Sequence, residues 1–375
     1  MPAALAPLRV QAGPLAAAHL RTHGLRPEDV ALVPAAAGGP KGLVLNPLDR
    51  FLFGDWLARS RRPGHVVHLA GASIGAWRMA CACAPDADAA LAAMAEAYIA
   101  QDYPHAPGRA PAPAEVSRIF GETIRTQFGP PGGAQEAALL AHPQRRLHMV
   151  TAQGRGLLAG RPGRLRTALG LGTAWAGNAL ARPGLGLGLT RCLFSDPRDP
   201  LPLPLADDGL PTRRIALDGR NLQAALRASC AIPLWLQAEQ DVPGAPPGPH
   251  WDGGLADYHF HWPYAALPEG PQAPPLVLYP HFQPTLVPGW FDKPWRRRHR
   301  PTAALDRLVL LSPDPAWVAG LPGGKLPDRG DFQRWADELP ARIRAWRSAL
   351  AASQALAETF ADWVEGRRAL PVQPL

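Results

Sequence analysis

Two apolar runs, each ending at a glycine turn and leading into a helical pattern, constrain the fold of this chain more than any other feature. Val30 to Ala37 ends at Gly38-Gly39, and residues 41–57 then carry apolar side chains at helical spacing. Residues 65–70 meet the turn Gly71-Ala72-Ser73-Ile74-Gly75 and a second helical stretch. Because strand, turn and helix repeat in this order, the pattern predicts an α/β fold with a central, mainly parallel sheet and helices on both faces.

The rest of the chain predicts one main domain with additions. Residues 1–28 are interpreted as a helical lead-in and residues 29–312 as the main domain. Residues 313–375 carry apolar side chains near helical spacing and are predicted to pack on the body as a C-terminal extension. The segment 155–190 is rich in Gly, Leu and Arg without a clean period, and we interpret it as an insertion, either a lid or an ordered surface segment. Further strands are predicted at 147–152, 190–194, 214–217, 276–279 and 308–311, and further helices at 86–101 and 113–128.

Composition favours a folded enzyme or binding domain. Hydrophobic residues make up 47% of the chain and 12 residues are tryptophan, which is enough to bury a large core. The formal net charge of +8 would attract nucleic acid, anionic lipid or acidic substrates. Apart from Lys41, Lys293 and Lys325, however, the basic residues are arginines spread along the chain. Because no basic repeat with interleaved aromatic residues is present, no nucleic-acid partner is predicted.

The cysteines and the N-terminus indicate a cytoplasmic protein. Cys81 and Cys83 are spaced C-x-C on a predicted helix, where they point apart, and this suits neither zinc nor a short disulfide. With Cys192 and Cys230 they are interpreted as buried free thiols of a reducing cytosol. Residues 1–20 lack a basic segment before an apolar core, so no signal peptide is predicted, and no transmembrane run is visible.

Ser73 is the candidate nucleophile. It lies in Gly71-x-Ser73-x-Gly75 between a predicted strand and a predicted helix, which is the context of a nucleophile elbow. The sharp turn of an elbow needs small residues on both sides of the serine. A serine that only caps a helix would not explain the two glycines. The motif therefore predicts acyl transfer through an activated serine.

The upstream glycine loop supplies candidates for an oxyanion hole. Acyl transfer needs N–H donors aimed at the developing oxyanion, and the backbones of Gly38 and Gly39 can provide them. Pro40 has no N–H and cannot donate. The loop lacks the spacing of a phosphate-binding loop. Lys41 is interpreted either as a residue that steadies the loop or attracts an anionic head group, or as a solvated lysine at a helix start.

The residue patterns alone leave the base of Ser73 open. Asp-Gly pairs begin at Asp208, Asp218 and Asp252, and the first two have ordinary interpretations as turns. The alternative is a Ser-His-Asp arrangement with His281, which follows a predicted strand.

A metal site is the less favoured interpretation of one polar cluster. Asp257, His259 and His261 lie within five residues of one another. Such groups are more often polar residues of a strand or loop, so no metal is predicted.

At this point the chain resembles the patatin-like phospholipase family. The successive motifs of that family are a Gly-Gly-Gly-x-Lys/Arg-Gly loop, a G-x-S-x-G elbow, an Ala-Ser-x-Ala-Ile-Pro stretch and an Asp-Gly-Gly/Ala base. Here they read, in the same order, Ala37-Gly38-Gly39-Pro40-Lys41-Gly42, Gly71 to Gly75, Ala228-Ser229-Cys230-Ala231-Ile232-Pro233 and Asp252-Gly253-Gly254. The resemblance covers residues 29–260. Its one departure is Ala37, where the family usually has its first glycine.

The resemblance implies a bacterial serine acyl hydrolase with a patatin-like three-layer sandwich and no cofactor. It implies that Asp252 is the proton acceptor in a dyad with Ser73, and that Gly38 and Gly39 form the oxyanion loop. The implied substrates are phospholipids, lysophospholipids or related esters, cleaved through an acyl-enzyme. The implied supporting residues are Lys41, Gly42, Gly71, Gly75, Gly253 and Gly254. A catalytically silent lipid-binding protein that keeps the fold is the alternative from another class.

One basic, aromatic segment suggests a membrane partner. Residues 290–300 read WFDKPWRRRHR, a mixture that is typical of interfacial lipid-binding segments. One hypothesis is docking on anionic lipid, with the cytoplasmic protein peripheral to the inner membrane. The other interpretation is a surface loop whose tryptophans pack inward.

Overall fold

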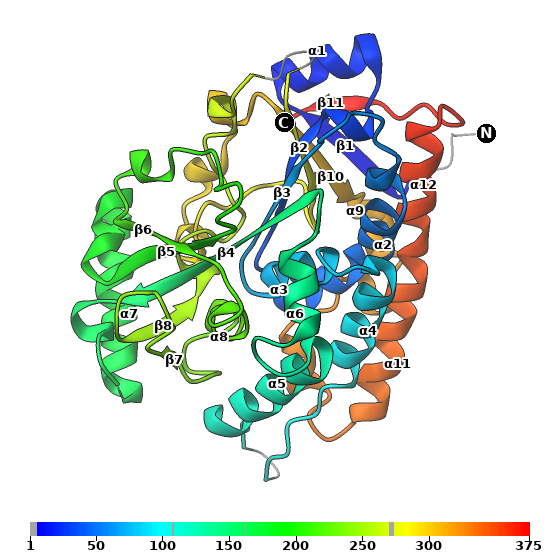
Figure 1. The fold of residues 1–375 in the computed structure, drawn as a ribbon. Helices are drawn as coiled ribbons and strands as arrows, with labels where there is room; N and C mark the ends of the chain where they lie inside the picture. Colours follow the sequence, from blue (N-terminus) through cyan, green and yellow to red (C-terminus); the bar gives the residue numbers. More distant parts are fainter. Residues whose placement is uncertain (1–5, 107–108, 162, 270–273) are drawn as a thin grey trace.

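The computed structural model describes residues 6–106, 109–161, 163–269 and 274–375, and one large mixed sheet runs through it (Figure 1). Within these residues the sheet has eleven strands in the order β11-β1-β10-β9-β2-β3-β4-β5-β6, and β7 and β8 branch from β4. The strands are β1 (Leu8–Ala12), β2 (Val30–Ala35), β3 (Val67–Gly71), β4 (Arg145–Gly154), β5 (Leu189–Ser195), β6 (Thr212–Ala216), β7 (Glu239–Gln240), β8 (Pro249–Asp252), β9 (Leu276–Pro280), β10 (Leu308–Pro313) and β11 (Val372–Pro374).

The centre of the sheet is parallel. β2 pairs in parallel with β3 and β9, β3 with β4, and β10 with β9. Antiparallel pairs join β1 to β10, β5 to β4, and β8 to the C-terminal half of β4. The prediction of an α/β protein with a mainly parallel sheet is confirmed. Because β2 and β3 run side by side in the same direction, the glycine loop after β2 and the Ser73 turn after β3 lie at the same edge.

Helices cover the first face of the sheet. Along β2 and β3 the side chains alternate, so that Val33 and Leu69 belong to this face and Leu32 and Ala70 to the other. The helices that share the core of the first face are α1 (Pro14–His23), α2 (Asn46–Gly54), α3 (Ile74–Ala82), α4 (Ala87–Ala100), α5 (Pro113–Phe128), α6 (Ala134–Leu140), α8 (Leu222–Ser229) and α12 (Gln354–Val364).

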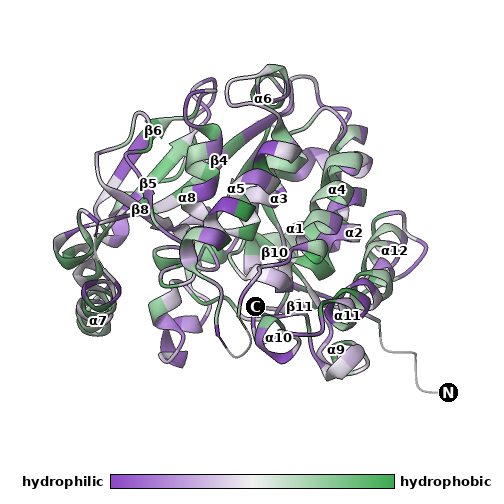
Figure 2. Ribbon diagram, turned by 90° about the horizontal axis from the view of Figure 1, so that it is seen from below, coloured by the Kyte–Doolittle hydropathy of each residue, from purple (hydrophilic) through white to green (hydrophobic). Residues whose placement is uncertain are grey.

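The second face is covered mainly by irregular chain and short 3-10 turns. Its core takes side chains from 201–205 and from 258–286, segments that are rich in proline, which interrupts α-helices. Helix α7 (Arg164–Leu180) packs beside the ends of β4 and β5 in a separate cluster, and Figure 2 shows it at the margin of the molecule. Helices were predicted on both faces; this is confirmed for the first face and holds only in part for the second.

Residues 313–375 add three more helices before α12 and end in strand β11. These are α9 (Pro315–Ala319), α10 (Gly330–Arg334) and α11 (Leu339–Ala352). Trp346 of α11 is buried with Leu43, Ala95 and Ile99, next to the helix that follows the glycine loop. Phe360 of α12 is fully buried in the main core. Within the described residues, no helix combines the length and the apolar character needed to cross a bilayer.

Candidate active site

Ser73 occupies a strained turn between β3 and α3. Its φ of 56° and ψ of −132° lie in a region that costs a non-glycine residue about 1–3 kcal/mol. The flanking glycines are required by space, because a Cβ on Gly75 would lie 1.9 Å from the carbonyl oxygen of Ala35 and one on Gly71 would lie 2.4 Å from that of Gly75. The turn therefore has the geometry of a nucleophile elbow.

Asp252 is the group that contacts the serine hydroxyl. The Oγ of Ser73 donates a hydrogen bond of 2.6 Å to Oδ2 of Asp252, and both residues are buried. The other carboxylate oxygen accepts a 2.7 Å bond from the N–H of Gly254. Asp252 ends β8, whose antiparallel pairing places it opposite Thr151 of β4. The pairing of β8 with β4 thus places the carboxylate of Asp252 next to Ser73.

The surroundings of Asp252 shift the pKa of its carboxyl group. Burial raises the pKa of this carboxyl above its ordinary value, while the hydrogen bond from Ser73 and the Arg329 guanidinium oppose the rise. A carboxylate with a raised pKa is a stronger base. Burial therefore suits Asp252 to accept a proton from Ser73.

The motif from Ala228 to Pro233 contacts both the Ser73 turn and β8, the strand that ends at Asp252. The Oγ of Ser229 accepts a 3.0 Å bond from the N–H of Ser73 and donates a 2.7 Å bond to the carbonyl of Val150. The carbonyl of Ala231 accepts a bond from the N–H of Asp252. One motif thus holds the backbones of both Ser73 and Asp252, a role that the sequence pattern did not reveal.

The glycine loop lies against the same cavity as Ser73. The 3-10 helix η2 (Gly39–Leu45) begins at Gly39, so the N–H of Gly39 has no partner within the helix. Gly39 has a φ of +57°, and a Cβ on Gly38 would lie 2.4 Å from the ring of Phe282. Ala37 has no positive φ, and its N–H donates to the carbonyl of Tyr258. Its Cβ is therefore tolerated at the one position that departs from the family pattern.

The other candidate bases make different contacts. Asp208 is paired with Arg191 at 2.6 Å, and Asp218 with Arg220 at 2.6 Å. Nδ1 of His281 lies 2.7 Å from the carbonyl of Gln283, and burial lowers the pKa of His281 to about 3. Ser73 is hydrogen-bonded to Asp252 instead. The geometry therefore favours Asp252 over His281.

The polar cluster at 257–261 is not arranged for a metal. Asp257 pairs with Arg191 at 2.6 Å, and Nδ1 of His259 accepts from the N–H of Val287. Among the described residues, no group of three or more His, Cys, Asp or Glu side chains is positioned to hold a metal ion.

Arg329 and Lys293 act on Asp252, and neither was predicted as a site residue, whereas Lys41 acts on Lys293. Burial lowers the pKa of Lys41, and burial with the nearby charges of Arg329 and Lys41 lowers the pKa of Lys293 to about 8. Nζ of Lys293 lies 4.4 Å from the ring centroid of Tyr258. Arg329 lies in the turn before α10, and no local motif marks it. An anionic group beside Asp252 would meet positive charge from Arg329 and Lys293, which come from two separate parts of the chain.

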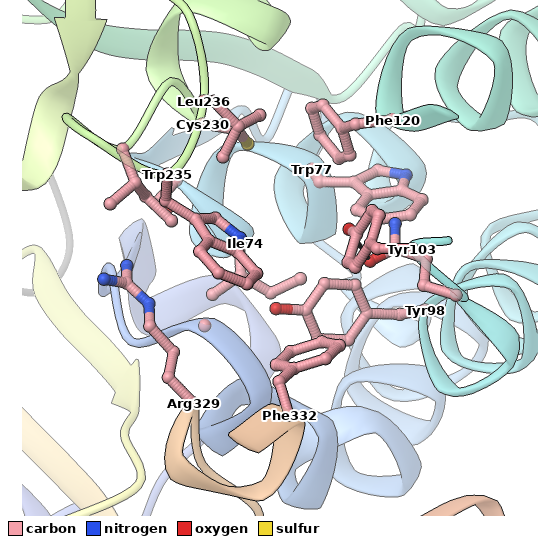
Figure 3. Close-up of a pocket in the computed structure, with 14 residues that line it drawn as sticks. Ile74, Trp77, Tyr98, Tyr103, Phe120, Cys230, Trp235, Leu236, Arg329 and Phe332 are labelled. Atoms are coloured by element: carbon pink, nitrogen blue, oxygen red, sulfur yellow. Dashed lines mark hydrogen bonds between the residues drawn. The ribbon is translucent and has the colours of Figure 1, made fainter. Parts of the chain in front are cut away.

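Two cavities meet at the dyad. The aromatic cavity, with about 500 Å³ of empty space that is partly open to solvent, reaches Ser73 and Gly39. Its walls include Trp77, Tyr98, Tyr103, Phe120, Trp235 and Phe332 (Figure 3). The outer cavity, with about 700 Å³, is lined by Asp252 and by Leu171, Leu234 and Trp290. Arg329 and Ile232 line both cavities, so the dyad lies at their junction.

Comparison with known proteins supplies no family for this chain. No protein-family model matches it, and no curated protein matches it significantly. Functional assignment therefore rests on the residues and their geometry.

Proposed function

We propose that this chain is a serine acyl-ester hydrolase of the patatin-like type, in which Ser73 is the nucleophile and Asp252 is its base. The observation that carries the proposal is the 2.6 Å bond from Ser73 Oγ to a buried carboxylate, made at a strained turn between a strand and a helix. The proposal includes a patatin-like three-layer sandwich. The mixed sheet, with helices on one face and mostly irregular chain on the other, supports its layered character.

The proposed reaction has two steps and requires no cofactor. Oγ of Ser73 attacks the ester carbonyl carbon while its proton passes to Asp252, and the N–H groups of Gly38 and Gly39 bind the oxyanion. The intermediate collapses to the acyl-enzyme, and the leaving alcohol takes the proton from Asp252. Water then attacks the acyl carbonyl and gives a proton to Asp252. The free acid leaves as the proton returns to Ser73.

We propose a lipid ester with an anionic group near the scissile bond as the substrate, such as a phospholipid or lysophospholipid. Arg329 and Lys293 support this choice because both act on Asp252, and Arg329 also lines both cavities. The aromatic cavity is suited to the acyl chain, because its walls are largely apolar. A cytoplasmic location is part of the proposal and is supported by four cysteines that are free and buried.

A fluorophosphonate probe tests the nucleophile directly. Wild type is expected to form one covalent adduct on Ser73, and Ser73→Ala none, because the probe reacts only with an activated serine. Ser117→Ala is the matched control and should label like wild type, because Ser117 lies on α5 and accepts a bond from the N–H of Gln237. A panel of p-nitrophenyl esters, followed by phospholipids, then defines the chain length. A folded wild type that gives no adduct would instead indicate a silent lipid-binding protein.

A further inference from the structure

The inserted segment exposes large apolar side chains to solvent. On α7 the exposed fractions are 75% for Leu165, 56% for Leu169, 43% for Trp175 and 90% for Leu180. Leu187, just after the helix, is 65% exposed. These five residues are called the α7 surface. Isolated exposed leucines are ordinary, but a group on one outlying helix marks an interaction site.

The turn around residues 290–300 is joined to this helix. Trp175 and Trp295 stack with ring centroids 6.2 Å apart. Asn178 donates a 2.7 Å bond to Asp292, and Arg298 donates to both Asp292 and the carbonyl of Asn178. The segment with the interfacial composition and α7 therefore present one continuous surface, to which Trp295 adds a partly exposed ring.

The two chain segments that carry the α7 surface and the neighbouring turn are strongly basic. From Gly154 to Ser195 the chain contains six arginines and no acidic residue. Arg191 and Arg182 are bound to carboxylates of the body, whereas Arg155, Arg161, Arg164 and Arg166 are exposed. The neighbouring turn adds exposed arginines at 296, 297 and 300, and its one acidic residue, Asp292, is buried. Exposed apolar side chains and exposed arginines carried by the same segments complement an anionic lipid surface.

The α7 surface lies beside an entrance to the dyad. Leu171 of α7 lines the outer cavity together with Trp290, Leu234 and Asp252. Leu234 and Trp290 are each 41% exposed, so the mouth of this cavity is apolar and continuous with the α7 surface. Figure 1 shows α7 projecting at the end of the molecule away from both termini.

We propose that the α7 surface docks on an anionic lipid bilayer and that the outer cavity takes a lipid ester directly from it. The delivery of an ester to Ser73 rests on the proposed function, whereas the docking itself does not. Apolar side chains enter the boundary between head groups and acyl chains while the arginines contact the lipid phosphates.

Co-sedimentation with vesicles tests the docking, and the Ser73→Ala protein is used throughout so that no lipid is consumed. Vesicles contain phosphatidylcholine alone or equal parts phosphatidylcholine and phosphatidylglycerol. The parent should bind the mixed vesicles. Leu165→Glu/Leu169→Glu should weaken this binding at least about tenfold, because two leucines that would enter the bilayer are replaced by anionic side chains. Both side chains are exposed, so the unfolding temperature should not change.

Leu15→Glu is the matched control. Leu15 is 47% exposed on α1, which contacts β1, β10 and β11 at the other end of the sheet from β5. The control makes the same leucine-to-glutamate change at one position outside the α7 surface, and vesicle binding should stay at the parent level.

A second variant tests the charge. Arg161→Gln/Arg164→Gln should weaken binding to the mixed vesicles about thirtyfold, because each arginine near an anionic surface contributes about 1 kcal/mol. Binding to phosphatidylcholine alone should change little. Added salt should weaken the binding of the parent to mixed vesicles, and it should have less effect on the binding of the variant.

The outcomes separate docking from catalysis. Equal binding by parent and Leu165→Glu/Leu169→Glu, or no binding by the parent, overturns the docking proposal. Self-association of the parent that the same variant abolishes, without vesicle binding, also overturns it and makes α7 a protein interface. Vesicle binding that depends on α7, in a wild type that cleaves no ester, leaves docking standing and rejects the hydrolase.

Discussion

At the scale of single residues, the proposed mechanism depends on a carboxylate in place of the more usual histidine base. Aspartate is a weak base near neutral pH, so it must touch the serine directly and lose some of its hydration. Both conditions are met by Asp252, which accepts the 2.6 Å bond from Ser73 and whose pKa is raised by burial. The exclusion of water from this carboxylate therefore contributes to its basicity.

Asp252→Asn should reduce kcat/KM for p-nitrophenyl esters by about 10³–10⁴, because the amide is not a base for the Ser73 proton. In wild type, activity should rise with pH through a pKa above the ordinary aspartate value, since the carboxyl must be ionised to act. A residual activity in the variant with the same pH profile as wild type would rule out Asp252 as the base.

The same substitution should change the pH dependence of stability. A folded-state pKa above the unfolded value means that the native state binds more protons, so the contribution of Asp252 to stability falls as pH rises between the two values. Asp252→Asn lacks this dependence. In urea unfolding, the variant should gain stability relative to wild type at neutral pH, and the gain should fade in acid. A loss of stability at neutral pH would contradict this.

Arg329→Gln should raise KM about tenfold for anionic lipid esters and change it little for neutral p-nitrophenyl esters, because Arg329 lines both cavities and lies in the field of Asp252. The ascending part of the pH profile should also move to higher pH, since Arg329 holds down the pKa of Asp252. Arg334→Gln, also exposed on the neighbouring helix, is the control and should behave like wild type. Equal effects on both ester classes would remove the head-group role.

At the scale of elements, the elbow depends on the close approach of α3 to β2. Gly75 permits this approach because its α-carbon faces the carbonyl of Ala35, where there is no room for a methyl group. Ser229 of α8 then holds the Ser73 backbone from the other side. Strand β3, helix α3 and helix α8 therefore together hold Ser73, and small residues permit the close packing of these elements.

Gly75→Ala should destabilise the protein by about 4 kcal/mol or more, because the added methyl group would overlap the backbone at 1.9 Å. Gly172→Ala on α7 is the control: nothing lies within 4 Å of the added Cβ, and alanine is favoured over glycine in a helix by about 1 kcal/mol. Chemical denaturation compares the two variants. A Gly75→Ala protein as stable as wild type would show that the elbow can be built differently.

At the scale of the whole molecule, the C-terminal helices complete the site as well as the core. Phe332 of α10 forms part of the aromatic cavity, and Arg329 precedes it by three residues. Trp346 donates a 2.9 Å bond to Asp331, which also binds Lys325, so the turn with Arg329 is anchored to α11. Residues far from the glycine motifs thus shape the entrance to the dyad.

Ending the chain at residue 320 should abolish folding and Ser73 labelling. It removes the buried side chains of Trp346, Leu356 and Phe360, which contribute about 5–9 kcal/mol together, comparable to the stability of a typical domain. Ending it at residue 368 removes the edge strand β11 and one buried side chain, Leu370, and should leave labelling intact. Circular dichroism and probe labelling measure both. A folded, labelled chain of 320 residues would show that the extension is dispensable.

Local chemistry determined what the sequence alone could predict. Gly71, Ser73 and Gly75 lie within five residues, so their spacing already encodes the turn, and strands at 147–152, 276–279 and 308–311 were recognisable from their own apolar runs. Strands β1, β7, β8 and β11 were not predicted. They are short and exist through pairing with distant strands, which no local pattern records.

Only the tertiary structure decided which carboxylate meets Ser73. Asp252 is 179 residues away, and its local pattern is shared by Asp208 and Asp218. The antiparallel branch of β8 on β4 brings it into contact. Arg329 and the exposed face of α7 were likewise beyond reach, because the charge at a site and the exposure of a surface depend on which distant segments pack together. The turn of Ser73, the proposed nucleophile, follows from its neighbours along the chain, whereas its contact with Asp252, the nearby cations and the proposed docking surface follow from packing.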